Sequence, residues 1–407
     1  MGSNSSKGKK YQDTSKYGEI YLKTDKTSYY PGETVTGHIH LNLIIEYPGN
    51  HLFVKFKGKE IVHIVRLEPR GNHAEYIKYS DKNNITKKNM LAHKWETLPI
   101  GQYTIPFSFM LPHHLPASFY QQGNKYLAFL EYQLEAFIQP NNNTDPKIKY
   151  KQPIVLKETI AQPREELPTQ VITPLKTCWC CKRGSNTLKV HFEKNYYAPG
   201  DTAKVIMKLD NNNTALKNQE VILALKQTLK LIAKGKMISK VITKTQQELS
   251  GTFSDNSLSI VLPRFPLPED YNQQIDKLKP TKSELKNLKE NNNVITSTTR
   301  SSLIISEFFL EVSCPMSGCC SNTPKAQCPI GIYYPDIDLP VVNPPNDWHP
   351  LTIEGVNLML PSDQNEVDEP LLKNIQEGGG QHMVQTQMIK VQDNNNPNHM
   401  MLEIQKQ

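Results

Sequence analysis

The chain has 407 residues, of which 37% are hydrophobic and 21% are charged, and its net charge is +7. This length and apolar content predict two domains with ordinary cores. The lysines are spread along the chain rather than gathered in one stretch, which argues against nucleic acid as a partner. No run approaches the ~18–20 consecutive apolar residues that a membrane-spanning helix needs.

The first ten residues, MGSNSSKGKK, lack the apolar core of a secretory signal, so we expect a cytoplasmic protein. Gly2 and Ser6 fit the M-G-x-x-x-[ST] pattern of N-myristoylation. Lys7, Lys9 and Lys10 follow, and such a basic cluster can supply the second signal that a single acyl chain needs for membrane binding. The sequence therefore predicts a peripheral protein of the endosomal or plasma membrane, unless Gly2 stands there by chance in a Ser-rich start.

Residues 1–16 are expected to be disordered, and residues 17–160 contain short runs of β-branched and aromatic residues separated by turns. In TVTGHIHLNL, the apolar residues Val35, Ile39, Leu41 and Leu43 fall on alternate positions, which is typical of a half-buried strand. Strands spaced about 8–12 residues apart, with Pro and Gly between them, predict an antiparallel β-sandwich.

The rest of the chain is divided by composition. Residues 161–177 contain three prolines and are interpreted as a linker, and residues 178–342 return to the strand pattern of a second sandwich. Within it, residues 269–299 are rich in Lys and Asn, which predicts a mobile polar insertion with at most a marginal helix. Residues 343–407 are poor in aromatic residues and are interpreted as a disordered tail.

One stretch of the sequence occurs twice in similar form. KTSYYPGETVTGHIHLNL begins at Lys26 and KNYYAPGDTAKVIMKLDN begins at Lys194, and a single offset aligns the Pro-Gly pair, the following acid and the threonine without a gap. Pro fixes φ at one position of a tight turn, and Gly accepts the positive φ of the next. Two such turns a domain apart, each entering an alternating strand, predict a duplicated sandwich.

These motifs resemble the arrestin superfamily, and most closely its arrestin-domain-containing proteins, the α-arrestins. The resemblance rests on the Y-x-P-G-E/D turn of each half, on LPIGQYTIPFSFMLPHHLPASF (Leu98 to Phe119) and on the entry to the second domain, LKTCWCCKRGSNTLKVHFEKNYYAPGD. It covers roughly residues 17–342. It implies an all-β chain of two tandem antiparallel, immunoglobulin-like β-sandwich domains with no catalytic centre and no cofactor.

The resemblance also implies a non-enzymatic adaptor in protein transport, which links membrane cargo to sorting, endocytic or ubiquitination machinery. The alternative is a structural coat subunit similar to the arrestin-like subunit of retromer. The chain departs from many α-arrestins at NPPNDW, where Pro344 and Pro345 lack the tyrosine of Pro-Pro-x-Tyr. Lys23 and Lys26 are likewise not the adjacent lysine pair of a phosphate sensor.

Seven cysteines, an odd number, agree with reduced thiols rather than a disulfide framework. Thiolates at short spacing can hold zinc, and exposed thiols can be acylated, but paired C-x2-C spacing is absent from this sequence. We therefore expect plain thiols and no metal, with zinc as a minor alternative. The candidate zinc ligands are Cys178, Cys180, Cys181, Cys314, Cys319 and Cys320.

A last motif lies in the predicted tail. Asp368, Leu371 and Leu372 form the D-x-x-L-L pattern of a sorting peptide, which would bind a coat adaptor in extended form. The plainer interpretation is a chance match in irregular chain marked by Pro370. No Gly-rich phosphate loop, H-E-x-x-H or G-x-S-x-G motif is present in the sequence.

Overall fold

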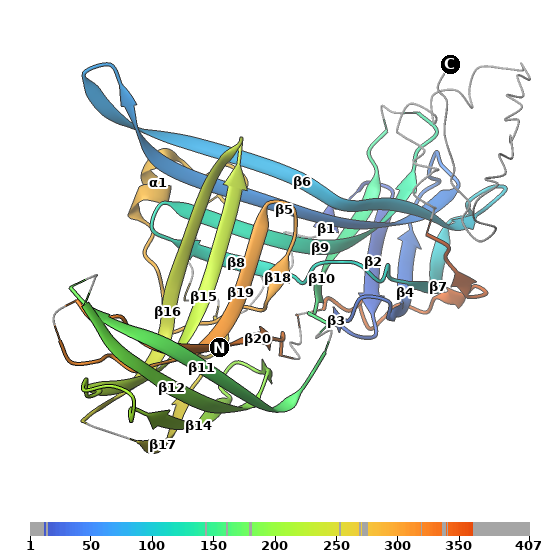
Figure 1. The fold of residues 1–407 in the computed structure, drawn as a ribbon. Helices are drawn as coiled ribbons and strands as arrows, with labels where there is room; N and C mark the ends of the chain where they lie inside the picture. The colour runs from blue at the N-terminus through green and yellow to red at the C-terminus, as the bar shows by residue number, and fades with distance from the viewer. Residues whose placement is uncertain are drawn as a thin grey trace, which may run out of the picture. The chain divides into compact units, whose positions relative to one another are not determined.

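The computed structural model describes residues 12–360, apart from 14, 143–144, 160–161, 179–180, 252–253, 268–269, 271–275, 319, 336–338 and 340. The described residues form two β-sandwiches, and this confirms the fold class predicted from the sequence (Figure 1). None of the helical structure in these residues is long and apolar enough to cross a membrane.

The first sandwich consists of a seven-stranded and a five-stranded sheet. The seven strands are β1 (Gln12–Asp13), β3 (Ser28–Tyr29), β5 (His51–Arg70), β6 (His73–Lys94), β8 (Phe119–Gly123), β9 (Tyr126–Gln139) and β10 (Ile148–Leu156). The five are β2 (Gly18–Thr24), β4 (Thr34–Leu43), β7 (Gly101–Met110), β21 (Leu351–Thr352) and β22 (Val356–Asn357). As the alternation predicted, Val35, Ile39, Leu41 and Leu43 of β4 all point into the core.

The second sandwich consists of a four-stranded and a six-stranded sheet. The four strands are β11 (Glu165–Thr177), β12 (Cys181–Lys194), β14 (Thr202–Asp210) and β17 (Asp255–Val261). The six are β13 (Tyr196–Tyr197), β15 (Glu220–Ala233), β16 (Lys236–Ser250), β18 (Thr299–Arg300), β19 (Ile304–Ser313) and β20 (Lys325–Ile332). Their inner residues form one core, in which Phe192, Leu223 and Phe308 are buried.

The repeated stretch forms a tight turn ahead of β4 in the first sandwich. The Glu33 carboxylate accepts a hydrogen bond from the Tyr30 backbone N–H at 2.9 Å and forms an ion pair with Lys26. Gly32, at φ +81°, donates its N–H to the Pro112 carbonyl at 3.2 Å. The acid therefore closes the turn, while the glycine ties it to the end of β7.

The second copy makes the same bonds ahead of β14. Asp201 accepts from the Ala198 backbone N–H at 2.9 Å, and its carboxylate lies 3.6 Å from Lys194 Nζ. Gly200, at φ +90°, donates to the Pro263 carbonyl at 3.2 Å. The duplication predicted from the sequence is thus a duplication of backbone geometry and hydrogen bonding.

The segment assigned from the sequence to a linker, 161–177, differs from the prediction. Its residues from 165 onward form β11, which pairs with β12 along its length. Pro168 and Pro174 are compatible with this strand because β11 lies at the edge of its sheet, where a proline costs no hydrogen bond to a second neighbour.

The predicted terminal tails also contain structure where they are described. Residues 12–13 pair with β10, and β21 and β22 pair in parallel with β7. The Trp348 ring lies 5.4 Å from the Tyr21 ring in an edge contact, and Leu358 is buried in the first core. The chain after the second sandwich therefore returns to the first, where it pairs with the edge of β7 and buries Leu358.

The two turn glycines allow backbone strain and side-chain clash to be separated. A Cβ at position 200 would meet nothing within 4 Å, whereas at position 32 it would lie 2.4 Å from the His113 ring. We expect Gly200→Ala to lower the free energy of unfolding by about 1–2 kcal/mol through its positive φ alone, and Gly32→Ala to lower it further. Chemical denaturation measures both values.

We expect the double variant Gly32→Ala, His113→Ala to lose less unfolding free energy than Gly32→Ala alone. Its loss should approach that of Gly200→Ala, because the clash with the His113 ring is removed. Equal losses for the two single variants would show that the His113 ring moves aside without cost.

Candidate functional site

The long hairpin of β5 and β6 presents two different faces. Even-numbered residues of β5, such as Phe56, Val62 and Ile64, are buried in the first core. Because strand side chains alternate, the odd-numbered residues point the other way. We call this second face, continued by the odd-numbered residues of β9 and β10, the outer face.

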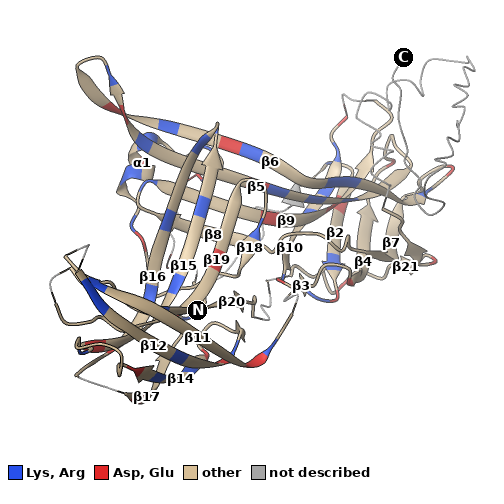
Figure 2. Cartoon of the chain, viewed as in Figure 1, with Lys and Arg blue, Asp and Glu red and all other residues tan. Residues whose placement is uncertain are grey.

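The half of the outer face nearest the start of β5 is rich in lysine, and stretches of Lys and Arg mark β5 and β6 in Figure 2. Phe53 lies opposite Phe137, and the two rings stack with centroids 5.4 Å apart. Lys55 Nζ lies 4.9 Å from the Phe137 centroid. We call this set the basic-aromatic patch, and it comprises Phe53, Lys55, Lys57, Lys59, Lys87, Glu131, Glu135, Phe137, Lys149 and Lys151.

The patch contains an electrostatic conflict. Lys57 lies directly opposite Lys87 in the antiparallel pair of β5 and β6, a placement that destabilises a sheet. Partial burial, together with the neighbouring charges of Lys82, Lys59, Lys55 and Lys87, lowers the pKa of Lys57. The positive charge of Lys59 is paired with Glu131, whose carboxylate lies 2.7 Å from Lys59 Nζ. A local conflict of this kind is typical of a functional surface rather than of a structural one.

The other half of the outer face is covered by the insertion of the second sandwich. This segment contains α1 (Lys282–Asn287), which begins at a capping box between Thr281 and Glu284. Leu285 and Leu288 are buried against apolar residues of the hairpin and β9, namely Ile61, Val65, Leu127 and Phe129. The sequence predicted a polar insertion with at most a marginal helix, and the structure contains one short helix there. Its two leucines are buried because another sheet offers them an apolar surface.

Hydrogen bonds fix the insertion in register with the hairpin. His63 Nε2 lies 3.0 Å from the Lys277 carbonyl, to which it donates, so its Nδ1 accepts from the Ser80 hydroxyl at 2.8 Å. Burial lowers the pKa of His63 to about 4. The ring is therefore neutral near pH 7 and holds this pair of bonds. Lys282 adds a surface ion pair with Glu75 at 3.2 Å.

In the half of the hairpin that the insertion covers, the inner face of the hairpin also contacts the second sandwich. Glu60 is fully buried there and accepts hydrogen bonds from Asn83 Nδ2 at 2.9 Å, from the Ser301 and Ser302 hydroxyls, and from the Leu303 backbone N–H at 3.1 Å. The end of the β15–β16 hairpin joins the first core through Leu229, Leu231, Ala233 and Ile242. The hairpin is thus held from both faces, and the basic-aromatic patch is the half that stays accessible.

Most site residues predicted from the sequence lie outside the described residues. These are Gly2, Lys7, Lys9, Lys10, Asp368, Leu371, Leu372, Cys180 and Cys319. The basic-aromatic patch was missed, although HLFVKFKGK, the start of β5, carries its lysines at alternate positions. That alternation places them on one face, but only the neighbouring strands show what surrounds them.

The candidate zinc ligands fall into two environments. Cys178, Cys181 and Cys320 are exposed, whereas Cys314 is buried in the core of the second sandwich with Cys328. Burial raises the pKa of Cys314 to about 12, so it is a poor source of the thiolate that zinc requires. Within the described part of the chain, no three His, Cys, Asp or Glu side chains come together as a metal site.

Comparison with known proteins agrees with this architecture. The first sandwich matches the family model of the arrestin (or S-antigen) N-terminal domain over residues 18–160, and the second matches that of the C-terminal domain over residues 182–337. The two domains in this order define the arrestin class. The chain belongs to the arrestin-domain-containing proteins.

Two curated relatives show how distant the likeness is. The chain is 25% identical over 226 residues to arrestin domain-containing protein A of Dictyostelium discoideum, which covers 52% of this chain and 38% of that protein. It is 25% identical over 207 residues to arrestin domain-containing protein 17 of Caenorhabditis elegans, which covers 47% of each. The match therefore spans less than half the length of either relative.

The contact between insertion and hairpin can be tested at one leucine. Leu285→Ala removes a fully buried side chain, and we expect it to lower the free energy of unfolding by about 2–4 kcal/mol. It should also speed amide exchange in residues 61–82 of the hairpin, as measured by mass spectrometry.

Leu278→Ala is the matched control, because Leu278 lies in the same insertion and is 53% exposed. If amide exchange in the hairpin were the same in both variants, the leucine contact would not be what holds the insertion in place.

Proposed function

We propose that the chain is a non-enzymatic arrestin-like adaptor in intracellular protein transport, which links membrane cargo to sorting, endocytic or ubiquitination machinery. The observation that carries the proposal is the pair of Lys57 and Lys87 at directly opposite positions on an accessible sheet face. The two arrestin domains support it, because this family acts through binding to other proteins. The cargo segment would be acidic or phosphorylated.

The chemistry of the patch suits such a segment. Carboxylates or phosphates placed between Lys57 and Lys87 would relieve their mutual repulsion and form charge-assisted hydrogen bonds. The half-buried ring of Phe53, which stacks on the buried ring of Phe137, offers a small apolar surface beside them. Because the opposite end of the hairpin is packed on both faces, the lysines are presented by a rigid sheet and lose little freedom when a partner binds.

We propose in addition that the N-terminus holds the adaptor at the cytoplasmic face of the endosomal or plasma membrane. Acylation of Gly2 would supply one weak anchor, and Lys7, Lys9 and Lys10 would attract acidic headgroups. The net charge of +7 has the sign that this attraction needs. Cargo would then be met by a protein already concentrated at the membrane.

Charge reversal tests the patch. We expect the Lys57→Glu, Lys87→Glu double variant to weaken binding of a fluorescent peptide rich in phosphoserine and glutamate by about tenfold or more. Fluorescence anisotropy at two salt concentrations measures this loss, and the wild-type affinity should fall as salt rises.

The control is Lys204→Glu with Lys208→Glu, which reverses two exposed charges on β14 of the second sandwich. Equal losses for the two double variants would mean that net charge alone binds the peptide, and the patch would have no special role.

Removal of the acylation site tests the anchor. Gly2→Ala is expected to abolish incorporation of a myristate analogue in cells and to move the protein from the membrane to the soluble fraction. Replacement of Lys7, Lys9 and Lys10 by Gln should keep the label but weaken membrane binding. A wild-type protein that is unlabelled and wholly soluble would contradict the proposed anchor.

A further inference from the structure

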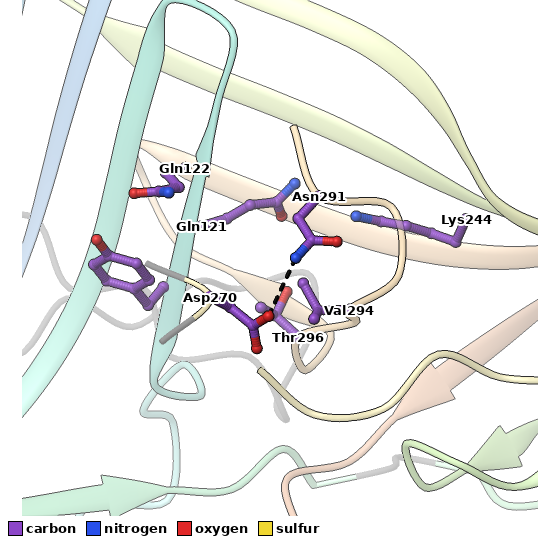
Figure 3. Close-up of a pocket in the computed structure, with 8 residues that line it drawn as sticks. Gln121, Gln122, Lys244, Asp270, Asn291, Val294 and Thr296 are labelled. Carbon is purple, nitrogen blue, oxygen red and sulfur yellow. Dashed lines mark hydrogen bonds between the residues drawn. The ribbon is translucent and has the colours of Figure 1, made fainter. Parts of the chain in front are cut away.

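A groove lies along one side of the second sandwich, between the edges of its two sheets. Residues 164–169, at the start of β11, line one wall, and residues 327–329 of β20 line the other. Its volume of about 360 Å³ falls within the range of about 300–1,000 Å³ that is typical of ligand clefts. By contrast, the cavity lined by Gln121, Lys244 and Asn291 has a volume of about 10 Å³, which is space for one water molecule (Figure 3). The groove is therefore the hollow that has room for a peptide.

The edge of β20 at the groove has backbone groups that are open to another strand. β13 pairs in parallel with β20 at Gly331 and Ile332, where the Gly331 N–H donates to the Asn195 carbonyl at 2.8 Å. Because successive backbone groups of a strand point in opposite directions, the N–H and C=O groups of Lys325 and Gln327 point the same way as those of Gly331. No described strand pairs with them on this side, since β19 lies on the other. This edge can therefore accept one more strand.

The first sandwich shows what fills the same place there. β3 is the counterpart of β13 and pairs in parallel with the end of β10, and β1 pairs antiparallel with Lys149 and Tyr150 along the same edge. With β3 and β13 in register, Lys149 and Tyr150 correspond to Lys325 and Ala326 of β20. The second sandwich has no described strand in this place, because the segment before β12 forms β11 and pairs with β12 instead. The groove is thus the counterpart of the place that β1 occupies.

The wall formed by β11 is acidic. Glu165 and Glu166 both line the groove, against one basic residue, Arg164. The Glu165 carboxylate accepts a hydrogen bond from the Tyr196 hydroxyl at 2.9 Å, and Glu166 is exposed. Glu166 also has a φ of +52°, in the left-handed region, which is strained for a residue with a side chain and is often found at binding sites. The charge of the groove therefore favours a basic ligand.

We propose that this groove binds an extended, basic peptide segment of a partner protein, which adds to β20 as a further strand. The segment runs antiparallel to β20, as β1 runs to β10. The N–H groups of Lys325 and Gln327 donate to its carbonyls, and their own carbonyls accept from its N–H groups. Pro329 has no N–H, so the ladder ends there. The main-chain bonds supply affinity, and the carboxylates of Glu165 and Glu166 select Lys or Arg side chains.

The groove differs from the basic-aromatic patch in place and in charge. The patch belongs to the first sandwich and favours acidic segments, whereas the groove belongs to the second sandwich and favours basic ones. One chain would thus bind two partners of opposite charge at separate sites. The groove does not depend on the patch, and either site can be disproved without the other.

The test is fluorescence anisotropy with the full-length protein and a labelled peptide, GKKYQDTS, which copies residues 8–15 of this chain. The peptide contains the β1 residues, which fill the equivalent place in the first sandwich, and two lysines. We expect saturable binding, and we expect Gln327→Pro to weaken it by about tenfold relative to Gln327→Ala. The proline removes the N–H that the peptide needs but no bond to β19, and Pro329 shows that β20 accepts a proline at such a position.

Gln327→Ala is the matched control. Both variants lose the side-chain bond from Gln327 to Glu311 at 2.7 Å, but the alanine keeps the backbone N–H. The difference in affinity between them therefore measures the N–H alone. Glu166→Gln should weaken binding several-fold and reduce its dependence on salt, because one carboxylate that attracts the lysines is removed.

Amide hydrogen exchange of the wild type gives a second measurement, in case Gln327→Pro impairs folding. Saturating peptide should slow exchange at Lys325 and Gln327. Slow exchange at these residues in the free protein would mean that the chain itself or a second copy fills the groove, and this would overturn the proposal. Equal affinities of Gln327→Pro and Gln327→Ala, or no saturable binding of the peptide, would overturn it as well.

Discussion

The carboxylate of Glu60 is buried at the junction of the sandwiches, and the donors that stabilise it come from both. Asn83 belongs to the hairpin, whereas Ser301, Ser302 and Leu303 belong to the second sandwich. Loss of the donors from the second sandwich while the carboxylate stays buried would leave a buried charge with a single donor, which costs far more than one ordinary hydrogen bond contributes. With the leucines of α1 on the other face, this constraint fixes half of the β5–β6 hairpin.

The fixed half determines what the other half can do. Because the insertion covers the outer face only beyond Lys59, the lysines before that point stay accessible, and they are attached to a rigid sheet. The opposed pair of Lys57 and Lys87 is unfavourable in the isolated sheet, and a rigid scaffold can tolerate such a conflict. Stability is thus concentrated at the junction, and binding capacity lies beside it.

The sequence by itself determined the strands and the duplicated turns, because alternation in β4 and the Pro-Gly-acid pattern are set by neighbouring residues. Tertiary structure decided what depends on a distant partner. Strand β11, the return of residues 351–357 to β7, and the helix at Leu285 each gain stability from a surface far away in the chain.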